Sequence, residues 1–249
     1  MSEPRILFLD VENIAELIWA WGIYEVNAIE VERPGHLLSM AYKWRGDKKT
    51  QVIAQCDFKD YKPKSASDKN LCKFIWKLLD EADVIIGHNA QSFDVKKINY
   101  RFIVNGLTPT SPYKVVDTLV SLKKVARGPS HKLDAIGKVM KIGRKLEHEG
   151  WPLWKKCYLG DKRAWAKMKL YNKQDVELLE KWYDKLLPWI SNHPNYNLYA
   201  GTIDKCPNCG GHLTRQGYTV TRVCKLQRFK CQSCGAWSTK PLKPFSVVR

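Results

Sequence analysis

The chain carries near its start the stretch Arg5-Ile6-Leu7-Phe8-Leu9-Asp10-Val11-Glu12-Asn13, a short apolar run that ends in two carboxylates. Such a run ahead of a polar break is typical of a buried central strand. Since Asp10 and Glu12 are two residues apart, a strand would project both side chains from one face. Neighbouring carboxylates repel each other unless a cation lies between them, and Mg²⁺ accepts such oxygen ligands. The pair alone fits a strand end entering solvent better than a metal site, but motifs further along the chain change that balance.

The whole chain is strongly basic and has enough apolar residues for a core. Its 249 residues, of which 44% are hydrophobic, suffice for one large domain, or for one domain with a small appendage. The formal charge of +17 and the pI near 9.5 indicate an acidic partner, most often a nucleic acid, with a merely basic soluble protein as the alternative. The sequence shows neither a secretory signal nor an apolar run of bilayer length, so we expect a cytoplasmic protein without membrane contact.

A third carboxylate is expected at a strand-to-helix junction. Residues 37–44 and 50–55 predict two strands around the turn Arg45-Gly46-Asp47, which form an antiparallel meander with the first strand. Helical spacing over residues 67–81 leads into a buried strand over residues 83–89, and a helix opens within residues 90–94. Asp94 therefore lies where the chain leaves a strand and enters a helix.

A further motif, Tyr171 followed by Asp175, lies in the helical stretch 168–179. Residues four apart share a helix face, so both side chains would project together. Taken in order, D-x-E after a strand, G-H-N-x-x-x-F-D and Y-x-x-x-D on a helix resemble the motifs of the DEDD superfamily of 3′–5′ exonucleases, in its tyrosine branch. The resemblance covers roughly Ile6 to Pro194. It implies an α/β, ribonuclease H-like fold with a mixed sheet flanked by helices.

The resemblance also implies a set of metal ligands and a reaction. Asp10, Glu12, Asp94 and Asp175 would hold two Mg²⁺ or Mn²⁺ ions ~4 Å apart on either side of the phosphodiester. Tyr171, with an ordinary pKa of ~10, would aim the attacking water rather than deprotonate it. The chain is also similar to exonucleases encoded by bacteriophages, which would place it in the cytoplasm of a bacterial host.

Between these motifs we expect supporting features and some nucleic-acid contacts. Asp117 is expected to cap a helix, with support of the metal ligands as the alternative, and Ser130 is expected to cap the next helix. A basic loop with Lys141, Arg144 and Lys145 and a Trp-rich loop at residues 151–154 follow, and Lys145 is expected to contact nucleic acid. A lysine of this loop could contact the scissile phosphate, as one does in some proofreading domains, but no motif fixes which one. Near the first strand, Trp19 and Trp21 could stack on unpaired bases, although each could equally be a core residue.

The end of the chain has the spacing of a metal-binding module. Two Cys-x-x-Cys-Gly motifs supply Cys206, Cys209, Cys231 and Cys234, whereas Cys224 has no such partner. The pattern predicts a structural Zn²⁺ held by four thiolates in a zinc ribbon, and fits a redox pair or disulfides poorly. Residues 205–249 contain nine Lys or Arg and no Asp or Glu, so we expect a nucleic-acid grip. The arginines expected to contact nucleic acid are Arg215, Arg222 and Arg228.

We therefore expect an exonuclease domain over residues 1–194, a linker over 195–204 and a zinc ribbon over 205–249. Single-stranded DNA 3′ ends are the expected substrate because basic grooves and aromatic stacking suit unpaired strands. An RNA 3′ exonuclease, a structure-selective endonuclease and a non-catalytic DNA-binding protein are the alternatives. The chain contains no polymerase domain, so a proofreading or recombination role would need a separate partner.

Overall fold

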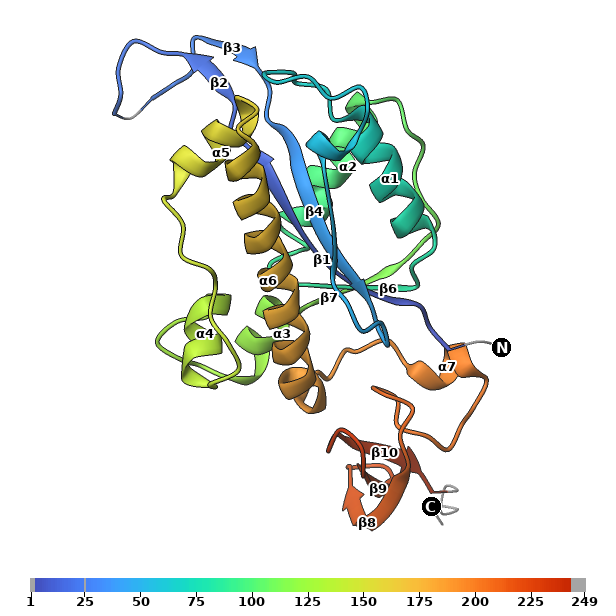
Figure 1. Ribbon diagram of the computed structural model, residues 1–249. Helices are drawn as coiled ribbons and strands as arrows, with labels where there is room; N and C mark the ends of the chain where they lie inside the picture. Colours follow the sequence, from blue (N-terminus) through green and yellow to red (C-terminus); the bar gives the residue numbers. More distant parts are fainter. Residues whose placement is uncertain (1–2, 25, 243–249) are drawn as a thin grey trace.

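A five-stranded mixed sheet forms the centre of the computed structural model, which describes residues 3–24 and 26–242. Its strand order is β5-β4-β1-β6-β7 (Figure 1). The strands are β1 (Ile6–Ile14), β4 (His36–Trp44), β5 (Gln51–Ala54), β6 (Val84–Gly87) and β7 (Lys114–Asp117). β4 is antiparallel to β1 and β5, whereas β6 is parallel to β1 and β7. The expected antiparallel meander and the α/β fold with a mixed sheet are thereby confirmed.

Helices cover both faces of this sheet (Figure 1). They are α1 (Lys69–Asp80), α2 (Asp94–Val104), α3 (Thr118–Val125), α4 (Leu133–Val139), α5 (Trp151–Tyr158) and α6 (Lys162–Leu186). Along β1, Phe8 packs in the cluster that contains α6 residues, whereas Leu7 and Leu9 pack in the cluster that contains α1 and α2 residues. Since Asp10 and Glu12 keep the alternation of Phe8, they face α6. The period of the strand therefore decides which helix can meet the carboxylate pair.

The parallel strands lead into helices through tight junctions. Gly87 ends β6 where a Cβ atom would lie 2.4 Å from the Cβ of Ala90, so only glycine fits there. Asp117 ends β7 and caps α3, because its Oδ1 accepts hydrogen bonds from the backbone N–H groups of Leu119 (2.9 Å) and Val120 (3.2 Å). The capping role expected for Asp117 is confirmed.

Two local predictions were wrong. Ser130 does not cap α4, whose N-cap is Lys132; the Ser130 hydroxyl instead accepts a hydrogen bond from the Lys132 backbone N–H. The expected Trp-rich loop forms the first half of α5, with Pro152 in its first turn. Proline is well tolerated there because the first helical N–H groups have no partner within the helix.

Two smaller sheets lie outside the central one. Between β1 and β4, β2 (Leu17–Trp19) pairs with β3 (Glu30–Arg33) in a hairpin that projects beside α5 (Figure 1). At the other end of the chain, a three-stranded sheet contains β8 (Leu213–Val220), β9 (Lys225–Cys231) and β10 (Trp237–Pro241). Residues 243–249 of the expected ribbon lie outside the described residues.

The segment expected to be a linker contains structure of its own. After the 3-10 helix η2 (Leu187–Trp189), the short helix α7 (Tyr196–Ala200) occupies half of residues 195–204. Within it, Asn197 is buried and donates a hydrogen bond from Nδ2 to the carbonyl of Lys205, at 2.7 Å. No helix in the described part of the chain is both long and apolar enough to cross a membrane.

Candidate active site and metal centre

Three of the four predicted carboxylates meet between β1 and α6. Oxygen atoms of Asp10, Glu12 and Asp175 all lie within 4.8 Å of one another. Asp94 stands apart from this cluster, because its Oδ1 accepts a hydrogen bond from the Val11 backbone N–H at 3.1 Å. It nevertheless lines the same cavity of about 480 Å³ as Asp10 and Glu12. All four carboxylates therefore border one site, although Asp94 is tied to the strand beside it.

The four carboxylates are buried, so their negative charges are costly unless a cation binds between them. Burial, with repulsion from Asp175, raises the pKa of Glu12 to about 8, and burial raises the pKa of Asp94 to about 6. The pKa values of Asp10 and Asp175 are also raised, with burial the largest cause for both. In addition, Asp175 Oδ1 is buried and has no hydrogen-bond partner among the described residues. A set of hard oxygen donors with an unpaired buried oxygen suits a divalent cation such as Mg²⁺.

Lys145 reaches into this site from the loop between α4 and α5. Its Nζ lies 2.5 Å from Asp175 Oδ2 and 3.2 Å from the Tyr171 hydroxyl. The loop is held there because the Lys145 backbone N–H donates to Asp134 Oδ1 at 2.9 Å. Burial alone would lower the pKa of Lys145, but Asp175 and Asp10 raise it above its usual range. The ammonium is therefore charged and contacts the acidic cluster.

Tyr171 lies beside Asp175 on α6, as the four-residue spacing predicts. Burial and the neighbouring Asp175 raise the pKa of its phenol above the usual range, so the hydroxyl is neutral at physiological pH. Its ring packs against His148 at 4.7 Å and Trp154 at 6.1 Å between centroids. A neutral hydroxyl held by packing can orient a water molecule but is a poor proton acceptor.

Two polar contacts, neither of them predicted from the sequence, hold the carboxylates in place. Asn172 donates from Nδ2 to Asp10 Oδ2 at 2.7 Å, and its Oδ1 accepts a hydrogen bond from the hydroxyl of Ser39 at 3.1 Å. Trp154 donates from Nε1 to Glu12 Oε2 at 3.1 Å. The position of Asn172 three residues before Asp175, on the same helix face, was the available signal. Nothing in the sequence pairs Trp154 with Glu12, because 142 residues separate them.

The loop between β6 and α2 is held by groups outside the acidic cluster. Asp117 accepts hydrogen bonds from the backbone N–H groups of Asn89 (2.9 Å) and Gln91 (3.1 Å). The His88 ring contacts the Thr118 hydroxyl and the carbonyl of His131, both at 2.9 Å. These contacts fix the approach of the loop to Asp94, in keeping with a supporting role for His88 and Asn89.

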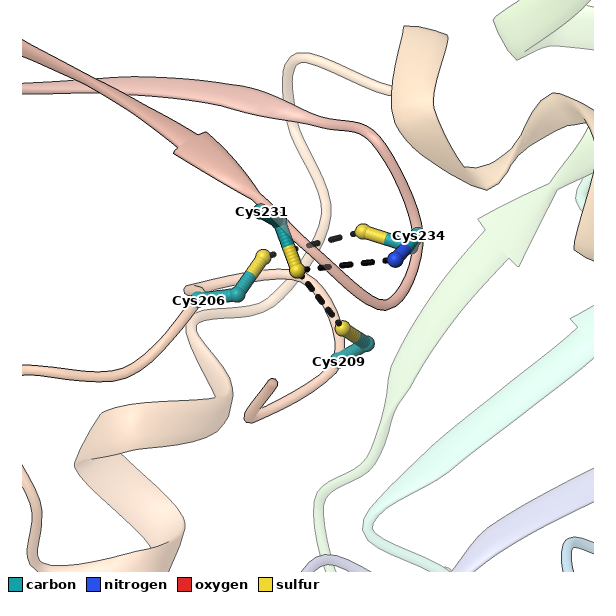
Figure 2. Close-up of side chains that lie close together, drawn as sticks. All are labelled: Cys206, Cys209, Cys231 and Cys234. Carbon is teal, nitrogen blue, oxygen red and sulfur yellow. Dashed lines mark hydrogen bonds between the residues drawn. The ribbon is translucent and has the colours of Figure 1, made fainter. Parts of the chain in front are cut away.

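The four predicted zinc cysteines form a second cluster (Figure 2). The Sγ atoms of Cys206 and Cys234 are 3.7 Å apart, and those of Cys209 and Cys231 are 3.6 Å apart. A tetrahedral Zn²⁺ with Zn–S bonds of ~2.3 Å requires sulfur atoms about 3.8 Å apart, so the four thiols fit that ion. Cys224 is absent from the cluster and hydrogen-bonds with Thr221 instead.

The other predicted nucleic-acid contacts lie on the surface. Trp19 and Trp21 are on the β2–β3 hairpin, 61% and 95% exposed, and neither lines the cavity of the carboxylates. The arginines predicted to contact nucleic acid in the C-terminal sheet are all exposed: Arg215, Arg222 and Arg228. Of these six basic or aromatic residues, only Lys145 meets the acidic cluster.

Comparison with known proteins supports the fold. The RNase H superfamily matches residues 36–187, a range that includes Asp94, Tyr171 and Asp175 but begins after Asp10 and Glu12. Among solved structures, the chain is similar to the family B DNA polymerase of the hyperthermophilic archaeon Pyrobaculum calidifontis, with a TM-score of 0.54 and 16% sequence identity. The similarity covers 75% of this chain and 25% of the polymerase chain. No curated protein matches the sequence.

Proposed function

Because the chain belongs to the RNase H superfamily, we propose that it is a metal-dependent 3′–5′ exonuclease of the DEDD type, tyrosine branch. The observation that carries this proposal is the meeting of Asp10, Glu12 and Asp175 within 4.8 Å at a cavity that Asp94 also lines. Tyr171 lies beside them on α6. Together these residues supply the oxygen ligands and the hydroxyl that phosphodiester hydrolysis by this class of enzyme needs.

In this proposal the four carboxylates would hold two Mg²⁺ or Mn²⁺ ions. When bound, these cations would supply Lewis-acid stabilisation of the charge that develops on the phosphate. Asn172 keeps the Asp10 carboxylate turned toward the cavity, and Trp154 does the same for Glu12. Because the two carboxylates are already fixed in one orientation, less entropy is lost when the site reaches the geometry that the reaction needs.

Tyr171 and Lys145 have roles toward water and phosphate. The neutral Tyr171 hydroxyl would hydrogen-bond the attacking water and aim it at phosphorus. Without substrate, the Lys145 ammonium pairs with the Asp175 carboxylate. When substrate binds, the flexible lysine side chain could turn from this carboxylate to a phosphate oxygen. We propose Lys145 as the scissile-phosphate contact on the strength of this position.

The mouth of the cavity supports an unpaired strand as substrate. Phe93 and Trp151 line it, with 40% and 51% of their surfaces exposed. Bases of a single strand stack on such rings at ~1–3 kcal/mol each, whereas paired bases cannot. We therefore propose single-stranded DNA 3′ ends as the substrate, acted on in the bacterial cytoplasm if the chain is encoded by a bacteriophage.

We also propose that residues 205–249 form a zinc ribbon that grips nucleic acid. The sulfur spacing supports Zn²⁺. Lysines and arginines, with no acidic residue between them, give this part of the chain the charge for phosphate contacts. The catalytic domain would be residues 1–194, with residues 195–204 joining the two. A polymerase or recombination protein would be a separate partner.

Gel analysis of labelled oligonucleotides tests the central proposal. With Mg²⁺, a 5′-labelled single-stranded DNA should give a ladder that shortens with time, whereas a 3′-labelled one should release labelled mononucleotide at once. EDTA should stop both reactions. Asp175→Asn should be inactive, while Asp184→Asn, on the same helix but paired with Arg45 at the surface, should keep full activity. A ladder from the 3′-labelled strand would show cleavage from the 5′ end or at internal bonds, and cleavage of a circular strand would show an endonuclease. Ribo-oligonucleotides in parallel decide between DNA and RNA.

A further inference from the structure

The β2–β3 hairpin is an exposed apolar projection with a negative charge. Its apolar side chains, all at least 37% exposed, are Leu17, Ile18, Trp19, Trp21, Ile23, Tyr24, Val26, Ile29 and Val31. Residues 16–32 contain four Glu and no Lys or Arg, in a chain with a formal charge of +17. Glu16, Glu30 and Glu32 are exposed and form no ion pair with the described residues. A large exposed apolar patch of this kind marks an interaction surface.

The charge of the hairpin disfavours nucleic acid as its partner. Trp19 and Trp21 could stack on bases, but the glutamates beside them would repel the phosphates that follow each base. The opposite sign is needed on the partner: an apolar recess with basic residues at its rim.

The same chain carries such a recess at the other end of α6. A groove of about 490 Å³ lies between α3, α4 and the end of α6. Its apolar lining includes Leu122, Val125, Ile136, Val139 and Trp189, and its charged lining residues are Arg127 and Lys185, both positive. Neither of these cations pairs with a carboxylate of the described residues, and Val139 and Trp189 are 74% and 66% exposed. We name this recess the α3–α4 groove.

Buried polar atoms in the groove also lack partners. Trp182 lines it and is only 5% exposed, yet its indole N–H makes no hydrogen bond with any described residue. His131 Nε2 is buried and unpartnered there as well. An unsatisfied buried N–H is destabilising, and a carbonyl or carboxylate that docks in the groove would offer it a partner. The unpaired edges of a two-stranded hairpin present such carbonyls.

We propose that the β2–β3 hairpin of one copy docks in the α3–α4 groove of a second copy. Within one chain the two features cannot meet, because α6, 25 residues or about 37 Å long, separates them (Figure 1). Between copies, the apolar side chains of the hairpin fill the groove, and Glu30 and Glu32 face Arg127 and Lys185. The contact joins different surfaces, so it is head-to-tail and leaves one hairpin and one groove free in each dimer. This inference goes beyond the proposed nuclease activity and does not depend on it.

Two variants that each disable one surface test the proposal. The hairpin variant, Ile23→Ser with Glu30→Lys and Glu32→Lys, changes no aromatic residue, so a loss of base stacking cannot explain its effect. The groove variant is Val139→Asp with Arg127→Glu and Lys185→Glu. All six positions lie outside the acidic cluster, and circular dichroism checks that both variants fold. Ile103→Ser, which removes an equally exposed apolar side chain from α2, is the control.

Sedimentation velocity over a range of concentrations measures the association. Wild type and Ile103→Ser should form dimers and longer species at low salt, and high salt should weaken them. Each surface variant alone should associate at least tenfold more weakly. A mixture of the two variants should give a dimer and nothing larger, since one intact hairpin and one intact groove remain. A wild type that stays monomeric, or a mixture that fails to pair, would overturn the proposal. Association of either surface variant as tight as that of wild type would overturn it as well.

Discussion

The two candidate metal sites of this chain are assembled in opposite ways. The oxygen site draws Asp10 and Glu12 from β1, Asp94 from the start of α2 and Asp175 from α6. These elements lie on two large hydrophobic clusters that would hold the sheet together without any ion. The sulfur site comes from two short Cys-x-x-Cys segments, and among the described residues its own buried cluster is limited to Cys206, Cys231 and Ala236. Packing of the α/β fold therefore positions the carboxylates without a metal ion. The small C-terminal sheet, in contrast, would depend on a metal ion bound by its cysteines in order to fold.

Asp10→Asn should have the largest effect on activity and a small one on stability. The neutral amide is a weak ligand for a hard cation, so cleavage should fall by roughly 10²–10³-fold or more. Because burial, with repulsion from the neighbouring carboxylates, raises the pKa of Asp10, removing its charge should leave the melting temperature in EDTA unchanged or higher. Initial rates and thermal melts with and without Mg²⁺ measure both quantities. A clearly lower melting temperature in EDTA would mean that the oxygen site supports the fold.

Cys231→Ser should show the reverse pattern. Binding of a structural zinc contributes ~10–16 kcal/mol to folding in small modules, so the C-terminal sheet should unfold and release one equivalent of zinc. Nucleic-acid binding should weaken, and its dependence on salt should become less steep by about 0.7 for each phosphate of a single strand that the ribbon no longer touches. Turnover of a saturating short substrate should change much less. Zinc content by mass spectrometry and binding at several salt concentrations test this prediction.

An equally tight and equally salt-sensitive Cys231→Ser protein would assign the ribbon to another task, such as docking to a protein. Cys224→Ser is the matched control, because Cys224 lies outside the cysteine cluster and should keep both zinc and affinity.

Tyr171→Phe should have an intermediate effect on the oxygen site alone. Without the hydroxyl the water can move, and a displacement of ~1 Å can cost about 10²-fold in rate, while the carboxylates remain in place. We expect a rate that is lower by about 10–100-fold under single-turnover conditions, with little change in substrate affinity. Tyr100→Phe, at an exposed tyrosine on α2, should be unaffected. An unchanged rate for Tyr171→Phe would remove this hydroxyl from the reaction.

The same contrast explains what the sequence could and could not predict. Periodicity is local, so it found β1 from its apolar run and placed Asp10 with Glu12, and Tyr171 with Asp175, on shared faces. The cysteine spacing is also local. In contrast, the hydrogen bond from Asn172 to Asp10 joins residues 162 apart. The spacing to Asp175 places Asn172 on the right helix face, but no local pattern identifies Asp10 as its partner. The hydrogen bond that the Asp94 carboxylate accepts from the Val11 N–H depends on a side-chain rotation that periodicity cannot give.

The boundary between the two units shows the same limit. Residues 195–204 have no periodicity, which predicted a linker, but the cysteine motif beyond them packs against the α/β fold. Cys209 and Cys234 lie against the cluster that contains α6 residues, and the Tyr196 N–H donates to the Pro207 carbonyl at 2.6 Å. Gly210 has a φ of +73° and passes so close to the Tyr196 ring that a Cβ atom would lie 2.4 Å from it. Such packing joins residues from two parts of the chain, so the local sequence of either part does not predict it.

The smallest expected effect comes from Asn208, which ties the cysteine segment to the backbone that follows α6. Its Nδ2 donates to the carbonyls of Leu187 (3.0 Å) and Ile190 (3.2 Å), which follow α6. Asn208→Ala removes both bonds but no sulfur ligand, so zinc content and turnover should stay normal while stability falls by about 1–3 kcal/mol. Urea unfolding and limited proteolysis between residues 195 and 204 measure the decrease, with the exposed Gln216→Ala as control. Full zinc with unchanged stability would mean that the ribbon does not depend on this contact. Loss of zinc would mean that the α/β fold helps to build the sulfur site. Both metal sites would then depend on packing of the large hydrophobic clusters.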